Sequence, residues 1–122
     1  MILLDDFYSI LQKVPTPGVV KAKIAINKKH RILEGHFPGL PVVPGVCMLQ
    51  IVKEIMEINS GRELRLTAAD NMKFLSVINP EQNNEVDVIV NYIDEEGKLS
   101  INATLFAGTV TFFKLKATLQ NS

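Results

Sequence analysis

The sequence contains one cysteine, Cys47, and no apolar run long enough to cross a membrane. A single cysteine excludes an intrachain disulfide framework and a zinc site built from several cysteines. Prolines and charged residues interrupt every apolar stretch before it reaches the roughly 20 residues of a membrane span. The first residues, Met1 to Asp6, lack the basic region of a signal peptide. We therefore expect a cytoplasmic protein with no membrane span.

An excess of charge of either sign is also missing. The 13 basic and 13 acidic residues give a formal net charge of zero, so we expect no nucleic-acid partner recruited by overall basicity. Apolar residues make up 47% of the chain, which argues against disorder. At 122 residues the length fits one domain with one core.

The first half of the chain predicts two helices and one clear strand. Apolar residues recur at helical spacing after Asp5 or Asp6, which predicts a short helix that ends at Pro15. Residues 19–26 alternate with period two and predict a half-buried strand, and residues 31–34 predict a short extended segment. Residues 35–45 are too rich in proline and glycine for regular structure. Residues 45–58 are apolar nearly all round and predict a buried helix.

The second half reads as four strands. Residues 63–69 predict a strand that continues, after a kink at Asp70-Asn71, to residue 78. Residues 86–93, 99–107 and 109–119 predict the other three, and residues 94–97 predict a hairpin turn. One buried helix beside an antiparallel meander, without alternating strands and helices, indicates an α+β protein.

The segment Gly35-His36-Phe37-Pro38-Gly39-Leu40-Pro41-Val42-Val43-Pro44-Gly45-Val46 closely resembles the active-site motif of the β-hydroxyacyl-[acyl carrier protein] dehydratases. Residues 72–80 resemble the strand that follows in that family. The resemblance implies that residues 1–122 form a single hotdog domain, in which a curved antiparallel sheet wraps around one long central helix. It also implies a homodimer, or a larger assembly of dimers, with a continuous sheet across the two subunits.

The resemblance also implies site residues. His36 would take a proton from a β-hydroxyacyl thioester, and the Gly45 amide at the helix N-terminus would polarise the thioester carbonyl. These roles suit a side chain that titrates near neutrality and unpaired helix amides. The substrate contacts it implies are Phe37, Pro38, Gly39, Pro44 and Val46. The partner would be an acyl carrier protein or a coenzyme A thioester, so that the substrate is carried on phosphopantetheine, and no metal or other cofactor is expected.

The family's acidic residue is missing from the expected position. Fourteen residues after His36, where the family has Glu or Asp, this chain has Gln50, and a carboxamide cannot act as a general acid at neutral pH. Glu54 follows one turn later on the same helix face, but one turn is about 5.4 Å along the axis. We therefore expect Gln50 to orient the substrate hydroxyl or a water, and we do not expect Glu54 to replace the acid.

Three functions remain open. The first is a dehydratase-like lyase of fatty-acid or related acyl-chain synthesis, whose site is impaired by Gln50. The second is a non-catalytic acyl-thioester-binding or partner subunit, and the third is a hotdog thioesterase. Two further expectations concern single side chains: Cys47 should be a small buried hydrophobe, and His30 a solvated turn residue. A basic run between Lys13 and Arg31 is either a solvated face or a docking surface for an acidic carrier protein.

Overall fold

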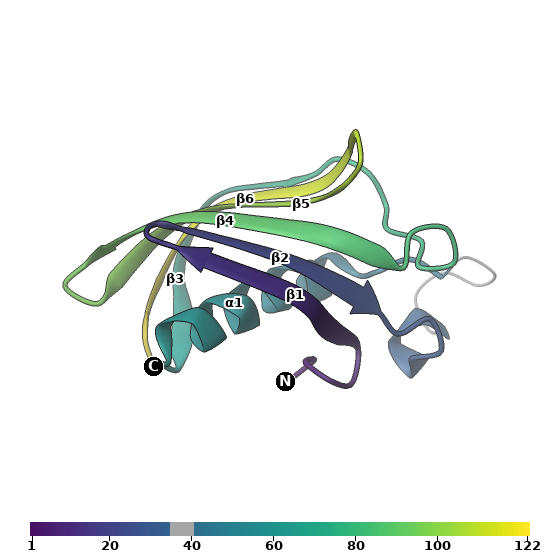
Figure 1. Cartoon of the computed structure of the whole chain (residues 1–122), viewed down its shortest axis with the longest axis horizontal. Helices are drawn as coiled ribbons and strands as arrows, with labels where there is room; N and C mark the ends of the chain where they lie inside the picture. The colour runs from purple at the N-terminus through teal and green to yellow at the C-terminus, as the bar shows by residue number, and fades with distance from the viewer. Residues whose placement is uncertain (35–40) are drawn as a thin grey trace.

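A computed structural model describes residues 1–34 and 41–122 of the chain. In this part, a six-stranded antiparallel sheet curves over one long helix, α1 (Gly45–Ser60), as Figure 1 shows. The sheet order is β1-β2-β4-β5-β6-β3. The strands are β1 (Tyr8–Thr16), β2 (Val19–Ile26), β3 (Leu64–Phe74), β4 (Glu85–Glu95), β5 (Lys98–Ala107) and β6 (Val110–Asn121). The predicted α+β arrangement of a curved sheet around a helix is confirmed.

The core lies between the sheet and α1, and the period-two pattern of the strands produces it. In β2, for example, Val20, Ala22, Ile24 and Ile26 are all buried. They form one cluster with apolar residues of α1 and of strands β4, β5 and β6. Helix α1 ends at Gly61, which has a positive φ of 69° and donates its backbone N–H to the carbonyl of Glu57. This is the left-handed helix ending that glycine favours.

The meander β4-β5-β6 is held in register by tight turns. Glu96 and Gly97 connect β4 to β5 and have φ values of 55° and 83°. Positive φ at both central residues is typical of the type I′ turn, whose twist matches that of the flanking strands. The hairpin predicted at residues 94–97 is confirmed.

The prediction of an N-terminal helix is wrong, because residues 8–16 form the edge strand β1. A register shift between Ile10 and Gln12 marks a bulge, which disrupts the alternation that would have indicated a strand. Pro15 lies inside β1, where an edge strand can tolerate its missing N–H. Pairing with β2 thus overrides the helical spacing of the apolar residues. Residues 31–34 also differ from the prediction, since they form a single 3₁₀ turn.

Strand β3 forms the other edge of the sheet and is exposed along its whole length after Leu64. The predicted kink is present as a register shift between Ala69 and Asn71, although the strand ends at Phe74 and does not reach residue 78. Phe74, the last residue of the strand, is 55% exposed. The exposed apolar residues on and just after this strand are Leu66, Met72, Phe74, Leu75 and Val77.

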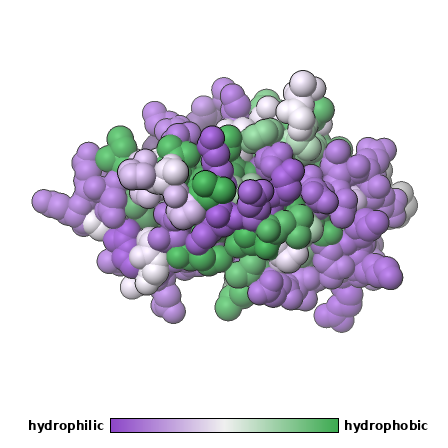
Figure 2. Space-filling model, viewed as in Figure 1, coloured by the Kyte–Doolittle hydropathy of each residue, from purple (hydrophilic) through white to green (hydrophobic). Residues whose placement is uncertain are grey.

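One side of α1 is likewise not covered by the sheet. Val46 and Ile58 are exposed, so the helix is not buried all round as predicted. Figure 2 shows a band of apolar side chains across the face that carries α1 and the N-terminal segment in Figure 1. Met1 and Ile2 belong to the exposed apolar residues of that segment. None of the helices in the described ranges is both long and apolar enough to span a membrane.

Candidate functional site

The site predicted from the sequence begins at the start of α1. Pro44 is the N-cap residue, with extended backbone angles (φ −62°, ψ 147°) and no side chain that could cap the helix. Its carbonyl accepts hydrogen bonds from the amides of Cys47 and Met48, at 3.0 and 3.3 Å. Among residues 1–34 and 41–122, no backbone acceptor is found for the first helical amides, at Gly45 and Val46, which have no partner within the helix. The segment before the helix is fixed to the loop that follows β3, since the Val43 amide donates to the Ile78 carbonyl at 2.9 Å.

Gly45 is packed against an aromatic ring. A Cβ atom at this position would lie 2.6 Å from Cε1 of Phe74, well inside van der Waals contact. The Phe74 ring also packs on Phe113, with ring centroids 5.1 Å apart. Glycine at position 45 thus permits the approach of Phe74. A ligand that binds the Gly45 amide would have to approach beside this ring.

Gln50 uses both hydrogens of its carboxamide within the chain. Nε2 donates to Oε2 of Glu54 and to the carbonyl of Met1, each at 2.7 Å. Both partners are acceptors, so the amide can have only this orientation. Oε1 is then the atom of Gln50 that can bind a further group, and only as an acceptor. Gln50 also lines an open hollow of about 450 Å³, together with Met1 and Ile2 of the N-terminal segment and Lys53 and Glu57 of α1.

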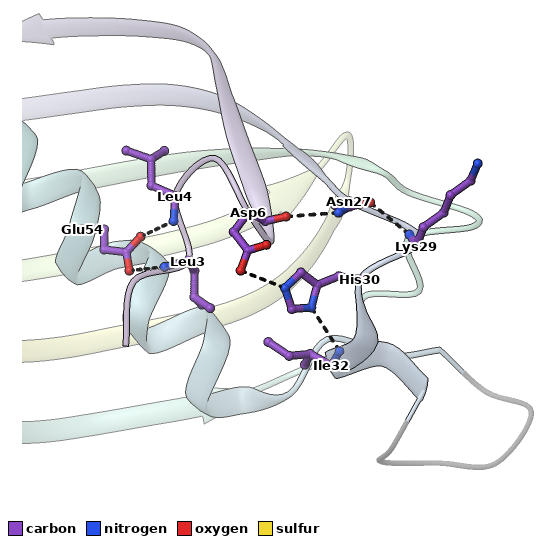
Figure 3. A network of polar contacts seen from close by, with 8 residues as sticks. All are labelled: Leu3, Leu4, Asp6, Asn27, Lys29, His30, Ile32 and Glu54. Carbon is purple, nitrogen blue, oxygen red and sulfur yellow. Dashed lines mark hydrogen bonds and ion pairs between the residues drawn. The ribbon is translucent and has the colours of Figure 1, made fainter.

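Glu54 is buried, with 5% of its surface exposed, and both its oxygens accept hydrogen bonds. The amides of Leu3 and Leu4 donate to Oε2 and Oε1, each at 2.8 Å, and the Tyr8 hydroxyl donates to Oε1 at 3.0 Å. With Gln50 Nε2, four donors surround one carboxylate. Figure 3 shows how Glu54 points from α1 at the backbone of the N-terminal segment. Burial, and then the negative charge of Glu54, raise the pKa of the Tyr8 hydroxyl, which therefore remains a donor.

His30 is not the solvated turn residue that we predicted. Nε2 lies 3.1 Å from the carboxylate of Asp6, and Nδ1 accepts a hydrogen bond from the Ile32 amide at 3.1 Å, as Figure 3 also shows. The ring packs edge-on against Phe7, with centroids 5.3 Å apart. His30 thus ties the turn after β2 to the N-terminal segment, which is a structural role.

Cys47 is buried as predicted, and burial raises the pKa of its thiol. A buried thiol with a raised pKa is a poor nucleophile at neutral pH. The expectation of a small buried hydrophobe is therefore confirmed.

Comparison with known proteins places these residues in a family. The family model described as "ApeI-like: ApeI dehydratase" matches residues 12–110. The chain belongs to the ApeI-like dehydratase family. It is also 31% identical over 111 residues to a 3-hydroxyacyl-[acyl-carrier-protein] dehydratase FabZ of Rickettsia massiliae, which covers 84% of the chain and 71% of the relative. A dehydratase of the same name from Fusobacterium nucleatum is 26% identical over 108 residues, covering 80% of the chain and 77% of the relative.

The solved structures give the same fold. The dehydratase heterocomplex ApeI:P from Xenorhabdus doucetiae matches with a TM-score of 0.74 at 18% identity, covering 92% of the chain and 96% of that structure's chain. The arrangement of sheet and helix is therefore the hotdog fold, as predicted. In this ApeI-like chain the structure brings together Gly45, Pro44 and Val46 at the helix start, with Gln50 on the second turn of α1. His36, Phe37, Pro38 and Gly39 lie outside the described residues.

The groups that hold Gln50 could not be predicted. The carbonyl of Met1 and the amides of Leu3 and Leu4 are backbone atoms, which no side-chain pattern can reveal. The available signal was the pair Gln50 and Glu54, four residues apart on one helix face. Two polar side chains on a largely buried helix require partners, and here each is partly the partner of the other.

Proposed function

We propose that this ApeI-like protein is a lyase that removes water from β-hydroxyacyl thioesters, and hydrates enoyl thioesters in the reverse direction. Membership of the dehydratase family is the observation that carries the proposal. The carrier would be an acyl carrier protein, since the matched relatives are named for that substrate. The reaction needs no redox cofactor in our proposal, because a proton transfer and the loss of water leave no net change in oxidation state.

In the proposed reaction, His36 accepts the proton from the carbon next to the thioester carbonyl. The amide of Gly45 donates a hydrogen bond to the carbonyl oxygen, on which negative charge develops. The carbon–oxygen bond of the β-hydroxyl then breaks as the double bond forms. His36 returns its proton to the departing oxygen, which leaves as water, so that the atoms and protons balance.

Gln50 would orient the hydroxyl in this reaction. Both of its N–H groups are used by Glu54 and Met1, so Oε1 can accept the hydrogen of the substrate hydroxyl but cannot donate to it. Glu54 is not a substitute acid, because its two oxygens already accept four hydrogen bonds inside the protein. The absence of a dedicated acid predicts slower turnover than in a relative with a carboxyl group at position 50.

We further propose that two copies of the chain pair along β3. This edge strand presents unpaired backbone groups and exposed apolar side chains such as Leu66, and Leu75 is exposed just after it. An edge of this kind readily pairs with another strand. Pairing would extend the sheet and cover the apolar residues at the end of β3. The molar mass in solution tests this proposal, and Leu75→Lys should shift the protein towards the monomer, whereas Lys98→Gln, on another strand, should not.

The decisive test of the activity is the loss of enoyl-thioester absorbance when the purified protein is added to a short enoyl chain on pantetheine. His36→Ala should abolish the activity, while His30→Gln, which changes the only other histidine of the chain, should retain it at temperatures where the variant is folded. Unchanged activity in His36→Ala would refute the assignment of the base. Release of free thiol from the thioester would instead indicate a thioesterase.

A second candidate function follows from Gln50. The ApeI:P protein of Xenorhabdus doucetiae is a heterocomplex, and a chain without its own acid could pair with a different chain that has one. It could also bind acyl thioesters without turning them over. Gln50→Glu separates these cases from the first proposal: a large gain in hydration shows a competent site that lacks only its acid. No activity in either form, together with binding of the thioester, favours the partner or binding role.

A further inference from the structure

Three lysines from two strands meet on the face of the sheet that points away from α1. Lys73 lies on β3, and Lys114 and Lys116 lie on β6. Leu115, between the last two, is buried in the core. Because side chains alternate along a strand, Lys114 and Lys116 must point to the opposite face. We call Lys73, Lys114 and Lys116 the outer lysine cluster.

The strand register brings the cluster together with neutral polar groups. Lys73 lies directly opposite Lys114, whose other neighbour is Thr104 on β5. Lys116 lies between Asn71 on β3 and Asn102 on β5. These side chains surround a hollow of about 300 Å³. The cluster therefore combines three positive charges with amide and hydroxyl groups around one recess.

No carboxylate neutralises this cluster in the described ranges 1–34 and 41–122. The ion pairs found there are Lys23–Asp87, His30–Asp6, Lys53–Glu57 and Arg62–Asp94, and none includes a lysine of the cluster. The lining of the hollow contains no acidic residue. Like charges directly opposite each other on neighbouring strands are destabilising. The direct pairing of Lys73 with Lys114 is thus unfavourable for the isolated chain and favours a negatively charged partner.

The basic run near the N-terminus is a weaker candidate for the same role. Lys23, on β2, lies 3.7 Å from the carboxylate of Asp87. Lys28 and Lys29 lie in the turn after β2, and there the carboxylate of Asp6 contacts His30. The run is therefore divided between strands and a turn, with acidic residues beside both parts.

We propose that the outer lysine cluster is the docking surface for the acidic protein that carries the acyl substrate. This inference rests on the proposed function. Carboxylates three or four residues apart on an acidic helix are separated by about 5–6 Å at Cβ, and directly opposite residues on neighbouring strands by about 4.5–5.5 Å. Two adjacent carboxylates of one helix therefore match Lys73 and Lys114.

The position of the cluster agrees with such a role. Lys73 immediately precedes Phe74, the residue whose ring lies against Gly45 at the start of α1. Successive side chains of a strand point to opposite faces. A carrier docked on Lys73 is thus on the outer face of the sheet. It lies at the same end of β3 as the start of α1, where the thioester carbonyl is proposed to bind.

The test compares one enoyl chain attached either to an acyl carrier protein or to pantetheine alone. The test variant carries Lys73→Gln, Lys114→Gln and Lys116→Gln, and the matched control carries Lys13→Gln, Lys21→Gln and Lys28→Gln. We expect kcat/KM for the carrier-bound substrate to fall about tenfold in the test variant at low salt, and the difference to shrink at high salt. The pantetheine substrate should be hydrated equally by the parent, the test variant and the control.

Each alternative result has a definite meaning. Equal losses on both substrates, or no loss on either, would overturn the docking proposal while leaving the proposed activity intact. A larger loss in the control would move the docking surface to the N-terminal basic run. If the parent hydrates neither the carrier-bound nor the pantetheine substrate, the proposed function itself fails. Fluorescence anisotropy with labelled carrier protein then still tests docking. If the protein binds vesicles containing anionic lipid through the outer lysine cluster but does not bind the carrier, the partner of the cluster is a membrane surface and the docking proposal is wrong.

Discussion

Replacing Glu54 should loosen the N-terminal segment far more than its place in the middle of a helix suggests. In Glu54→Ala, four donors lose their acceptor: the amides of Leu3 and Leu4, the Tyr8 hydroxyl and the Gln50 carboxamide. Leu3 and Tyr8 are buried, so water cannot replace the lost oxygens, and each buried donor without a partner costs about 1–3 kcal/mol. Leu4 and Gln50 are partly exposed and regain water. The expected loss is about 3–5 kcal/mol, out of a typical total of about 5–15 kcal/mol.

Glu54→Gln should cost less, because it keeps the shape of the side chain and one carbonyl oxygen. If the new amide nitrogen takes the place of Oε1, the Tyr8 hydroxyl can rotate and accept from it, and only the partly exposed Leu4 amide lacks an acceptor. We expect a loss of about 1–3 kcal/mol. Glu57→Gln is the matched control one turn later, since within residues 1–34 and 41–122 that side chain accepts one hydrogen bond, from the Leu64 amide, and lies near Lys53.

Urea unfolding at pH 7 measures these differences, and amide hydrogen exchange locates them. Exchange at Leu3 and Leu4 should accelerate strongly in both Glu54 variants and remain unchanged in Glu57→Gln. A loss in Glu54→Ala no larger than in Glu57→Gln would refute the stabilising role of the Glu54 contacts. A fall in stability with the amides of Leu3 and Leu4 as protected as in the parent would refute it as well.

Three further predictions concern titrating groups. In Gln50→Glu the new carboxyl group lies near the carboxylate of Glu54, and this negative charge raises the pKa of the new group. A group whose pKa is raised in the folded state contributes stability only at low pH, so the urea midpoint of the variant should fall further below that of the parent between pH 5 and pH 8. A difference in midpoint that is the same at both pH values would contradict the geometry. The raised pKa of Tyr8 means that its contribution to stability is complete below about pH 10 and is lost as the pH rises further. The parent should therefore lose stability faster than Tyr8→Phe between about pH 10 and 11.5, and parallel curves would argue against the contact. The raised pKa and burial of Cys47 predict that iodoacetamide at pH 8 modifies the folded protein much more slowly than the urea-unfolded chain, and similar rates would show an accessible thiol.

The elements that could be predicted from the sequence are those with an undisturbed local pattern. Residues of β2 alternate without interruption, and α1 is apolar over four turns, so both were found. Strand β1 was missed because a bulge between Ile10 and Gln12 breaks its alternation and because edge pairing is decided by a neighbouring strand. The exposure of β3 could not be predicted, since a strand at a sheet edge has the same local sequence preferences as a strand that is covered.

Within the candidate site, too, only the features with a local sequence pattern could be predicted. Gly45 and Gln50 could be placed from a motif that is continuous in sequence. The partners of Gln50 and the outer lysine cluster could not, because each brings together atoms that are far apart along the chain. Lys73 and Lys114, for example, are adjacent only through the pairing of β3 with β6.

The long sequence separation of the Glu54 contacts also has a consequence during synthesis. Leu3 and Leu4 donate to a carboxylate that is 51 and 50 residues further along the chain. At about 5–20 residues per second, a ribosome needs roughly 3–10 s to make that stretch. Throughout that interval the buried side chains of Leu3 and Phe7 have no helix to pack on. The β1–β2 hairpin is complete before Glu54, which binds the segment in front of it, has been made. The segment around Leu3 and Leu4 is thus fastened only once α1 has been synthesised, so its folding depends on the order of synthesis.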